Sequence, residues 1–345
     1  MTQLATLPDP LAEVAPPRGR SGGAAAWGSW LARRLGLAFL TLWLVSVLVF
    51  LATAALGDPV RAILGRDYDS NVGRREQLEA QLGVDDSIVT RYLDWLGGLV
   101  TGDFGTSLAN QQPVWQQISD TVLNTLALVL LAALVMIPLA FGIAMVSAHF
   151  RRKRPDTVIQ TILLALAGVP EFVTGILLVA LFSTSVFTIF PAVTIASPTG
   201  RPWDTPEGMV LPVATLVVAV TPYVSRIVRA TLLEVLDSDY VELARLKGIP
   251  ESVVMRKHAL LNAIVPGIQV IALQLAWLAG GVVLVETLFA YPGVGRQLVD
   301  SVRNHDVPMV QALSMIIAGV YIVVNLVADV LSILLTPRAR TAISS

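Results

Sequence analysis

Six long apolar segments divide this chain of 345 residues, and they restrict its fold more than any other feature. A helix needs about 20 apolar residues to cross a bilayer, and inside lipid the backbone has to satisfy its own hydrogen bonds. Only 14% of the residues are charged, whereas soluble domains have about 25%. We therefore predict an all-α, polytopic membrane protein with six transmembrane helices, over residues 35–56, 122–148, 157–187, 210–233, 264–288 and 311–335.

The basic residues predict the orientation of these spans, because cytoplasmic connections are enriched in Lys and Arg. With the amino terminus inside, the four inner segments hold 15 of them, and the two short outer segments hold three. Both termini and the loop 234–262 are therefore expected in the cytoplasm. Residues 1–30, rich in Pro, Gly and Ala, are expected to form a disordered cytoplasmic tail before a membrane domain over residues 31–340. The first apolar run is too long for a cleaved signal peptide, so we expect a permanent span.

Composition also excludes several kinds of site. The chain has no Cys, and its three His lie far apart in sequence, so we expect no disulfide and no metal site. A net charge of −1 gives no reason to expect nucleic-acid binding. The sequence contains no G-x-x-x-x-G-K-[ST] phosphate-binding loop. We therefore expect no catalytic residues and no cofactor in this chain.

The outer region, residues 57–121, is too long for a tight connection and is expected to carry structure of its own. Apolar residues recur there at helical spacing, which predicts an amphipathic helix at the outer membrane interface. Gly102-Asp103-Phe104-Gly105 predicts a turn after it. This helix would either cover the spans or contact a partner outside the cell. Its apolar face comprises Ile88, Tyr92, Trp95, Leu96 and Leu99.

The loop 234–262 predicts a rigid element rather than a flexible connection. Asp237 or Ser238 suits the amino-terminal cap of a short helix, and Gly248 suits its left-handed end. Pro250 would then start a second helix that leads into the fifth span. On these residues alone, two interpretations stay open: the short helix docks in a partner's groove, or its basic residues hold it against the inner leaflet. Its apolar side chains are Tyr240, Val241, Leu243, Ala244 and Leu246.

The same loop resembles a known motif. It resembles the EAA loop by which permeases of ATP-binding-cassette importers dock their ATPases. The resemblance is carried by Glu242-Leu243-Ala244, by Gly248 and by the run from His258 to Pro266. Leu243 departs from the small residue that is usual at its position. The chain as a whole resembles the first permease of dipeptide and oligopeptide importers. Further stretches carry this resemblance in order: Gly57-Asp58-Pro59, Leu82-Gly83-Val84-Asp85-Asp86, Gly102-Asp103-Phe104-Gly105, Asn124-Thr125-Leu126, Val169-Pro170-Glu171-Phe172, Glu286-Thr287-Leu288-Phe289, Pro292-Gly293-Val294-Gly295 and Pro337-Arg338-Ala339-Arg340.

The resemblance implies a type I ABC importer permease fold in the bacterial inner membrane. It implies a second, non-identical permease, two cytoplasmic ATPases that bind ATP and Mg, an external substrate-binding protein, and membrane lipid as partners. The small Ala244 would let an ATPase approach closely. The residues expected to couple to the ATPase are Asp239, Tyr240, Glu242, Ala244, Arg245, Lys247 and Gly248.

Three polar residues inside the spans are candidates for the substrate pathway, because buried polar groups in lipid usually face a cavity or a partner. Glu171 could bind a substrate amine, pair across a permease interface, or bond a backbone group freed by Pro170. Glu286 could line a gate, although capping of the following segment is the favoured alternative. Gln274 is the third candidate; helix–helix packing is its alternative, and is the role we expect for Asn325 and Asp329.

The expected solutes are di- and oligopeptides, and related importers of this architecture carry nickel chelates, glutathione or oligosaccharides. A different class would be a secondary transporter driven by an ion gradient. That class predicts inverted repeats and intramembrane carboxylate pairs, and it leaves the docking loop unexplained. A membrane scaffold without transport would not need polar, proline-broken spans.

Overall fold

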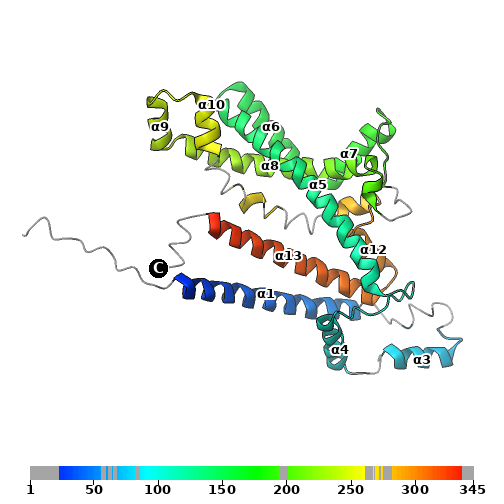
Figure 1. Ribbon diagram of the computed structural model, residues 1–345. Coiled ribbons are helices and arrows are strands. Elements are labelled where there is room, and N and C mark those ends of the chain that lie inside the picture. The colour runs from blue at the N-terminus through cyan, green and yellow to red at the C-terminus, as the bar shows by residue number, and fades with distance from the viewer. Residues whose placement is uncertain are drawn as a thin grey trace, which may run out of the picture.

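The computed structural model describes residues 23–55, 60, 64, 68–82, 86–194, 201–260, 267, 269–271, 273, 274 and 282–335 (Figure 1). Within these ranges the chain is helical and has no strand, only an isolated bridge between Thr106 and Pro113. Residues 1–22 of the predicted tail lie outside the described residues, whereas residues 23–30 form the start of a helix. Of the family-like stretches, residues 57–59, 83–85, 261–266 and 337–340 also lie outside them.

The named helices run as follows: α1 Gly23–Ala54, α3 Val72–Leu82, α4 Ile88–Thr101, α5 Val114–His149, α6 Arg154–Ala167, α7 Glu171–Val179, α8 Glu207–Leu236, α9 Asp239–Leu246, α10 Glu251–Val253, α12 Val294–Arg303 and α13 Val307–Leu335. A π-helical turn, Ala180–Thr184, extends α7, another, Val254–Leu260, extends α10, and a 3-10 turn, Pro202–Asp204, precedes α8.

Four of these helices, α1, α5, α8 and α13, are long and apolar enough to cross a membrane. The predicted third span, 157–187, is not one straight helix, because α6 and α7 meet at an angle of 99°. Pro170 explains the break: it has no amide to donate and its ring disfavours a continuing helix. The described end of the predicted fifth span, 282–288, is helical, and most of 264–281 lies outside the described residues. The count of six spans therefore stays a prediction.

The two long helices α5 and α8 form the centre of the fold. Ala132, Ala140 and Ala144 of α5 are almost completely buried against the apolar face of α8 that carries Val224 and Val228. Small side chains let two backbones approach closely, which is a common way to pack helices in lipid. α6 and α7 pack against α8 as well.

A second pair, α1 and α13, lies side by side along its length (Figure 1). Gln311 donates to Thr53 over 2.8 Å within this pair. Arg34 and Asp329 form an ion pair at 2.5 Å, so the expected helix–helix role of Asp329 is confirmed. Asn325 instead donates to the carbonyl of Tyr321 in its own helix.

The predicted outer helix exists as α4. Ser87 caps its start by accepting from the Thr90 amide, and Gly102 ends it with a φ of +82°. Its aromatic face packs on α1, because the Tyr92 hydroxyl lies 2.9 Å from Ser46 Oγ and the Trp95 ring lies 5.8 Å from Phe50. These aromatic groups fix α4 to the first span rather than only to the membrane interface.

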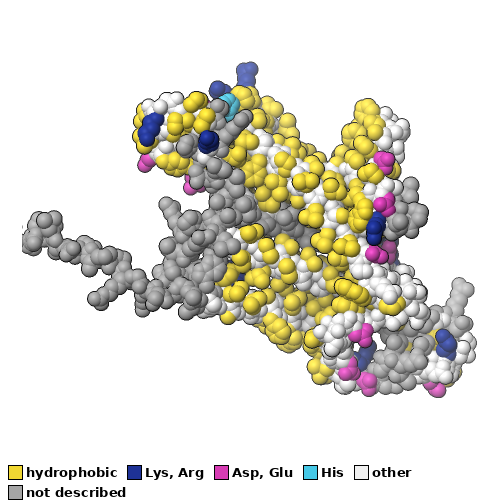
Figure 2. Space-filling view, in the orientation of Figure 1, with side chains coloured by type: hydrophobic (Ala, Val, Ile, Leu, Met, Phe, Trp, Pro, Cys, Tyr) yellow, Lys and Arg dark blue, Asp and Glu magenta, His cyan; other side chains and the backbone are white. Residues whose placement is uncertain are grey.

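Charged side chains gather at opposite ends of the molecule. Figure 2 shows them around α9 and α10 at one end and around α3, α4 and α12 at the other, with hydrophobic side chains over the face between. The start of α1 and the end of α13 lie at the same end as α9 (Figure 1). This distribution matches an apolar band that crosses a bilayer between two polar surfaces.

Candidate functional site

The short helix expected in the 234–262 loop is present as α9, and its ends follow the predicted signals. Ser238 is the residue before its first turn, although the Ser238 hydroxyl donates back to the Val235 carbonyl rather than capping an amide. Gly248 adopts a φ of +73°, a left-handed conformation that glycine reaches without strain. Its amide donates to the Arg245 carbonyl over 2.9 Å. α10 begins one residue after Pro250.

The two faces of α9 have different partners. Val241 is fully buried and Ala244 is 6% exposed, both within the core that α5 and α8 share. Ala244 therefore helps to seat α9 on its own chain, and a contact of this residue with a partner stays a prediction. Leu243 and Leu246 are 52% and 79% exposed, and Tyr240 is also exposed. These three apolar side chains form the outward face of α9.

Arg245 connects the helices of the loop to one another. Its guanidinium donates to both Glu251 oxygens, at 3.0 and 2.7 Å, and to the Leu236 carbonyl at 3.2 Å. The hydrogen bond from Arg245 lowers the pKa of Glu251 below its ordinary value. Arg245 thus joins the end of α8, α9 and α10 into one unit. Arg245 is itself exposed, as are Asp239, Glu242 and Lys247.

A second set of charges connects the loop to the 149–156 segment. Arg151 donates to Asp237 at 2.6 and 3.2 Å, and this contact lowers the pKa of the Asp237 carboxyl. Deeper inside, Arg229 makes two hydrogen bonds to the buried Asp156, at 2.9 and 2.6 Å. Asp156 also accepts from Ser147 over 2.6 Å. The ends of α5, α6 and α8 are therefore bound together beneath α9.

At the opposite end of the fold, Glu286 caps α12. It is fully buried and accepts from Thr125 Oγ1 at 2.6 Å and from the amides of Gly295 and Arg296 at 2.7 and 3.2 Å. A Cβ on Gly293 would lie 2.0 Å from Glu286 Oε1, so glycine is required there for close approach. Carboxylates are stabilised at the positive end of a helix dipole. The capping alternative therefore accounts for Glu286.

This cap brings together three stretches that carry the family resemblance. The Asn124 side chain donates to the Pro292 carbonyl over 2.8 Å, and the Tyr291 hydroxyl donates to the Asn124 carbonyl over 2.7 Å. The Val294 amide donates to Thr125 Oγ1 over 2.9 Å. Asn124-Thr125, Glu286 and the Pro-Gly-Val-Gly run thus form one buried cluster at the outer end of α5. The sequence showed the parts without showing that they touch.

Glu171 and Gln274 line one cavity of about 750 Å³, together with Tyr223 and Tyr321. Glu171 Oε2 is buried there without a hydrogen-bond partner among the described residues. The two pathway candidates predicted from sequence are therefore brought together. Glu286 does not line this cavity.

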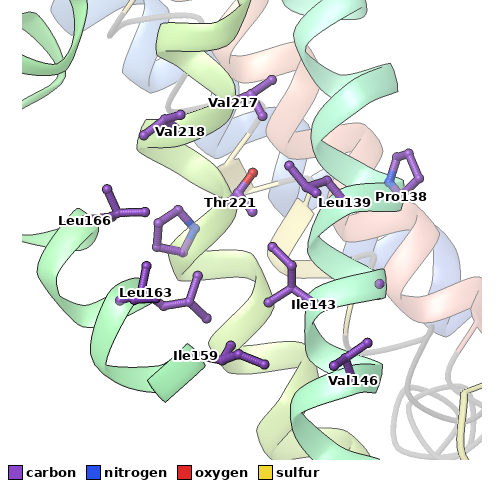
Figure 3. A pocket seen from close by; sticks show the side chains of 13 residues that line it. Pro138, Leu139, Ile143, Val146, Ile159, Leu163, Leu166, Val217, Val218 and Thr221 are labelled. Carbon is purple, nitrogen blue, oxygen red and sulfur yellow. The ribbon is translucent and has the colours of Figure 1, made fainter. Parts of the chain in front are cut away.

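A second cavity of about 550 Å³ continues from the first, because Ala167 and Tyr223 line both. It holds Arg226, Arg229 and Glu234 of α8. A third cavity, of about 500 Å³, lies between α5, α6 and α8 (Figure 3). Its lining is apolar apart from Thr221, so it offers nothing to a charged solute.

Residues 140–341 match the family described as binding-protein-dependent transport system inner membrane component, and residues 29–129 match its amino-terminal membrane component family. The glutathione transport system permease protein GsiC of Escherichia coli strain K12 is 36% identical to this chain over 309 residues, 89% of this chain and 97% of the relative. GsiC of Shigella dysenteriae serotype 1 gives the same values. The chain belongs to this permease family.

Membership of the family of inner-membrane importer permeases confirms the resemblance drawn from sequence. It identifies the chain as a transport permease of an ABC importer and not as an enzyme. In this permease, sequence reasoning predicted the short helix α9, the cavity-lining residues Glu171 and Gln274, and the capping alternative for Glu286. It missed Tyr223, Tyr321 and Arg226 as cavity-lining residues. The signal for Arg226 was present, because a charged residue inside an apolar span is uncommon.

Proposed function

We propose that this permease forms half of the translocation path of an ATP-driven importer of short peptides, a class that includes the tripeptide glutathione. The observation that supports this most is the shared cavity of Glu171 and Gln274. An unpartnered carboxylate at membrane depth is costly unless it meets a ligand or partner. It suits a solute with a protonated amine, and the glutathione permeases named above are relatives of this chain.

Coupling to ATP hydrolysis would start at α9. Two cytoplasmic ATPases, which hold ATP and Mg, would bind the outward face formed by Tyr240, Leu243 and Leu246, with Asp239, Glu242 and Lys247 at its edge. Because Val241 and Ala244 seat α9 in the α5–α8 core, a movement of α9 would carry α8 with it. α8 also lines both polar cavities. A movement of α9 would therefore be transmitted through α8 to the cavities that hold the solute.

The remaining partners are a second, non-identical permease that completes the path and an external binding protein that delivers solute. Both termini and α9 would face the cytoplasm. The common location of the start of α1, the end of α13 and α9 supports this orientation (Figure 1). The basic residues of the inner segments support it as well.

The test is uptake into proteoliposomes. The complex purified through this permease, with its binding protein, would be given labelled glutathione, a labelled dipeptide, a nickel chelate and an oligosaccharide. ATP-dependent, saturable uptake of glutathione or the dipeptide is expected. Uptake of only the nickel chelate or oligosaccharide would reject the peptide class. Uptake driven by an ion gradient without ATP would reject the importer mechanism.

A further inference from the structure

Arg226 is a charged residue in the long apolar helix α8, and the two arginines of this helix differ in their surroundings. Arg229 also lines the second cavity, but two hydrogen bonds to Asp156 hold its guanidinium. Arg226 forms no ion pair with any described residue; its side chain is exposed and lines the second cavity. Because an intramembrane arginine is costly without a partner or aqueous surroundings, it indicates a functional site.

Helix geometry directs Arg226 toward that cavity. Tyr223, Arg226, Ala230 and Glu234 line it and recur every three or four residues, so they share one face of α8. A different face, which includes Val224, is buried against α5. The charge of Arg226 therefore belongs to a continuous strip along the cavities rather than to the packed core.

Side chains of opposite charge line the two polar cavities, one after the other along this face of α8. The first holds Glu171, whose Oε2 has no hydrogen-bond partner among the described residues. The second, joined to it through Tyr223 and Ala167, holds the Arg226 guanidinium. Glu234 lies eight residues after Arg226, about 12 Å along the helix axis. It is therefore too distant along the helix to neutralise Arg226 directly.

We infer that Arg226 binds the carboxylate of the transported solute while Glu171 binds its amino group. This inference rests on the proposed importer function and specifies its substrate class: solutes with a free amine at one end and a free carboxylate at the other. A guanidinium is planar and can donate two parallel hydrogen bonds to a carboxylate. Arg226 is thus a specificity-determining residue on the inner part of the path.

The experiment measures maximal ATP-dependent uptake in proteoliposomes with saturating binding protein. The probes are the dipeptide Ala-Phe and its carboxyl-terminal amide, Ala-Phe-NH₂. Arg226→Gln should lower uptake of the free acid by about tenfold or more, the change expected from one lost charge-assisted hydrogen bond. Arg226→Lys keeps the positive charge but cannot make the two parallel hydrogen bonds, so its loss should be smaller than that of Arg226→Gln. The matched control Arg154→Gln removes an exposed arginine that lines neither cavity and should leave uptake unchanged.

Uptake of the amide should be lower than that of the acid in the wild type, and Arg226→Gln should reduce this difference. An equal loss in Arg226→Gln and Arg226→Lys, or no loss in either, would overturn the carboxylate role while wild-type transport still upholds the importer. A wild-type complex that carries neither probe would reject the proposed peptide importer, and the role of Arg226 with it. Subunit content, measured on the same preparations, establishes that each variant assembles, and basal ATP hydrolysis should be unchanged in the control Arg154→Gln.

Discussion

Helix α9 allows a sharp test of docking, because two of its apolar side chains have opposite surroundings. Leu246 is 79% exposed, whereas Val241, five residues earlier, is fully buried. If the ATPase covers the outward face, Leu246→Ala should weaken ATPase binding without lowering the stability of the permease. Val241→Ala should lower that stability instead, because it leaves a cavity in the core.

The expected changes in binding free energy and in the free energy of unfolding follow from these exposed fractions. Leu246→Ala removes three carbon groups, each contributing about 0.8 kcal/mol when buried. With 79% of the residue available to a partner, full coverage corresponds to a loss of about 2 kcal/mol, or about thirtyfold in the dissociation constant. Val241→Ala removes two carbon groups and should lower the free energy of unfolding by about 2 kcal/mol.

Both quantities can be measured on nanodisc preparations. Titration with labelled ATPase gives the dissociation constant, and intrinsic tryptophan fluorescence on heating gives the unfolding midpoint. Unchanged ATPase affinity in Leu246→Ala would refute the docking assignment and favour a position of α9 against the inner leaflet. A lowered unfolding midpoint in Leu246→Ala would show instead that this side chain packs within the permease.

Three further substitutions test the buried networks and the surface ion pair. Glu286→Ala leaves two α12 amides and a hydroxyl without their acceptor and should lower the free energy of unfolding by about 3–5 kcal/mol; an unchanged thermal midpoint would contradict the cap. Asp156→Asn leaves the partly buried Arg229 charge without its counter-ion and should lower the free energy of unfolding by about 2–4 kcal/mol. A fall in the thermal midpoint no larger than that of a substitution at an exposed site would contradict the role of this ion pair. Arg151 depresses the pKa of Asp237 below its ordinary value of 3.8, so their pair stabilises the fold above that pH and loses its effect as the pH falls through the lowered value. The difference in midpoint between wild type and Arg151→Gln should therefore shrink in acid, and a pH-independent difference would refute this.

Local signals predicted much of the fold. Apolar length located the long helices, while Gly102 and Gly248 marked helix ends, because such ends depend on neighbouring residues. The break between α6 and α7 was underestimated. Pro170 was recognised as a bend, but the 99° angle depends on how α7 packs against α8, and periodicity carries no information about that packing.

The site was predicted less completely, because its parts come from distant positions. Hydrophobicity marked both Val241 and Leu246 as apolar, and only the packing of α9 on the α5–α8 core shows which of them is available to a partner. The Glu286 cap joins residues more than 150 positions apart, such as Thr125 and Glu286. The residue type and its position in the sequence favoured Glu286 as a capping residue. The fold was needed to identify the groups that donate hydrogen bonds to it.

The most direct test of the central claim is a cross-link between α9 and an ATPase. The chain has no Cys, so Lys247→Cys places a single reactive thiol at the end of α9, and Val100→Cys places one on α4, where the side chain is 81% exposed. With a short photoreactive thiol reagent, the purified importer complex should give an ATPase-containing adduct from Lys247→Cys and none from Val100→Cys. The absence of that adduct from Lys247→Cys, or its formation from Val100→Cys, would contradict the assignment of α9 as the helix that couples this permease to ATP.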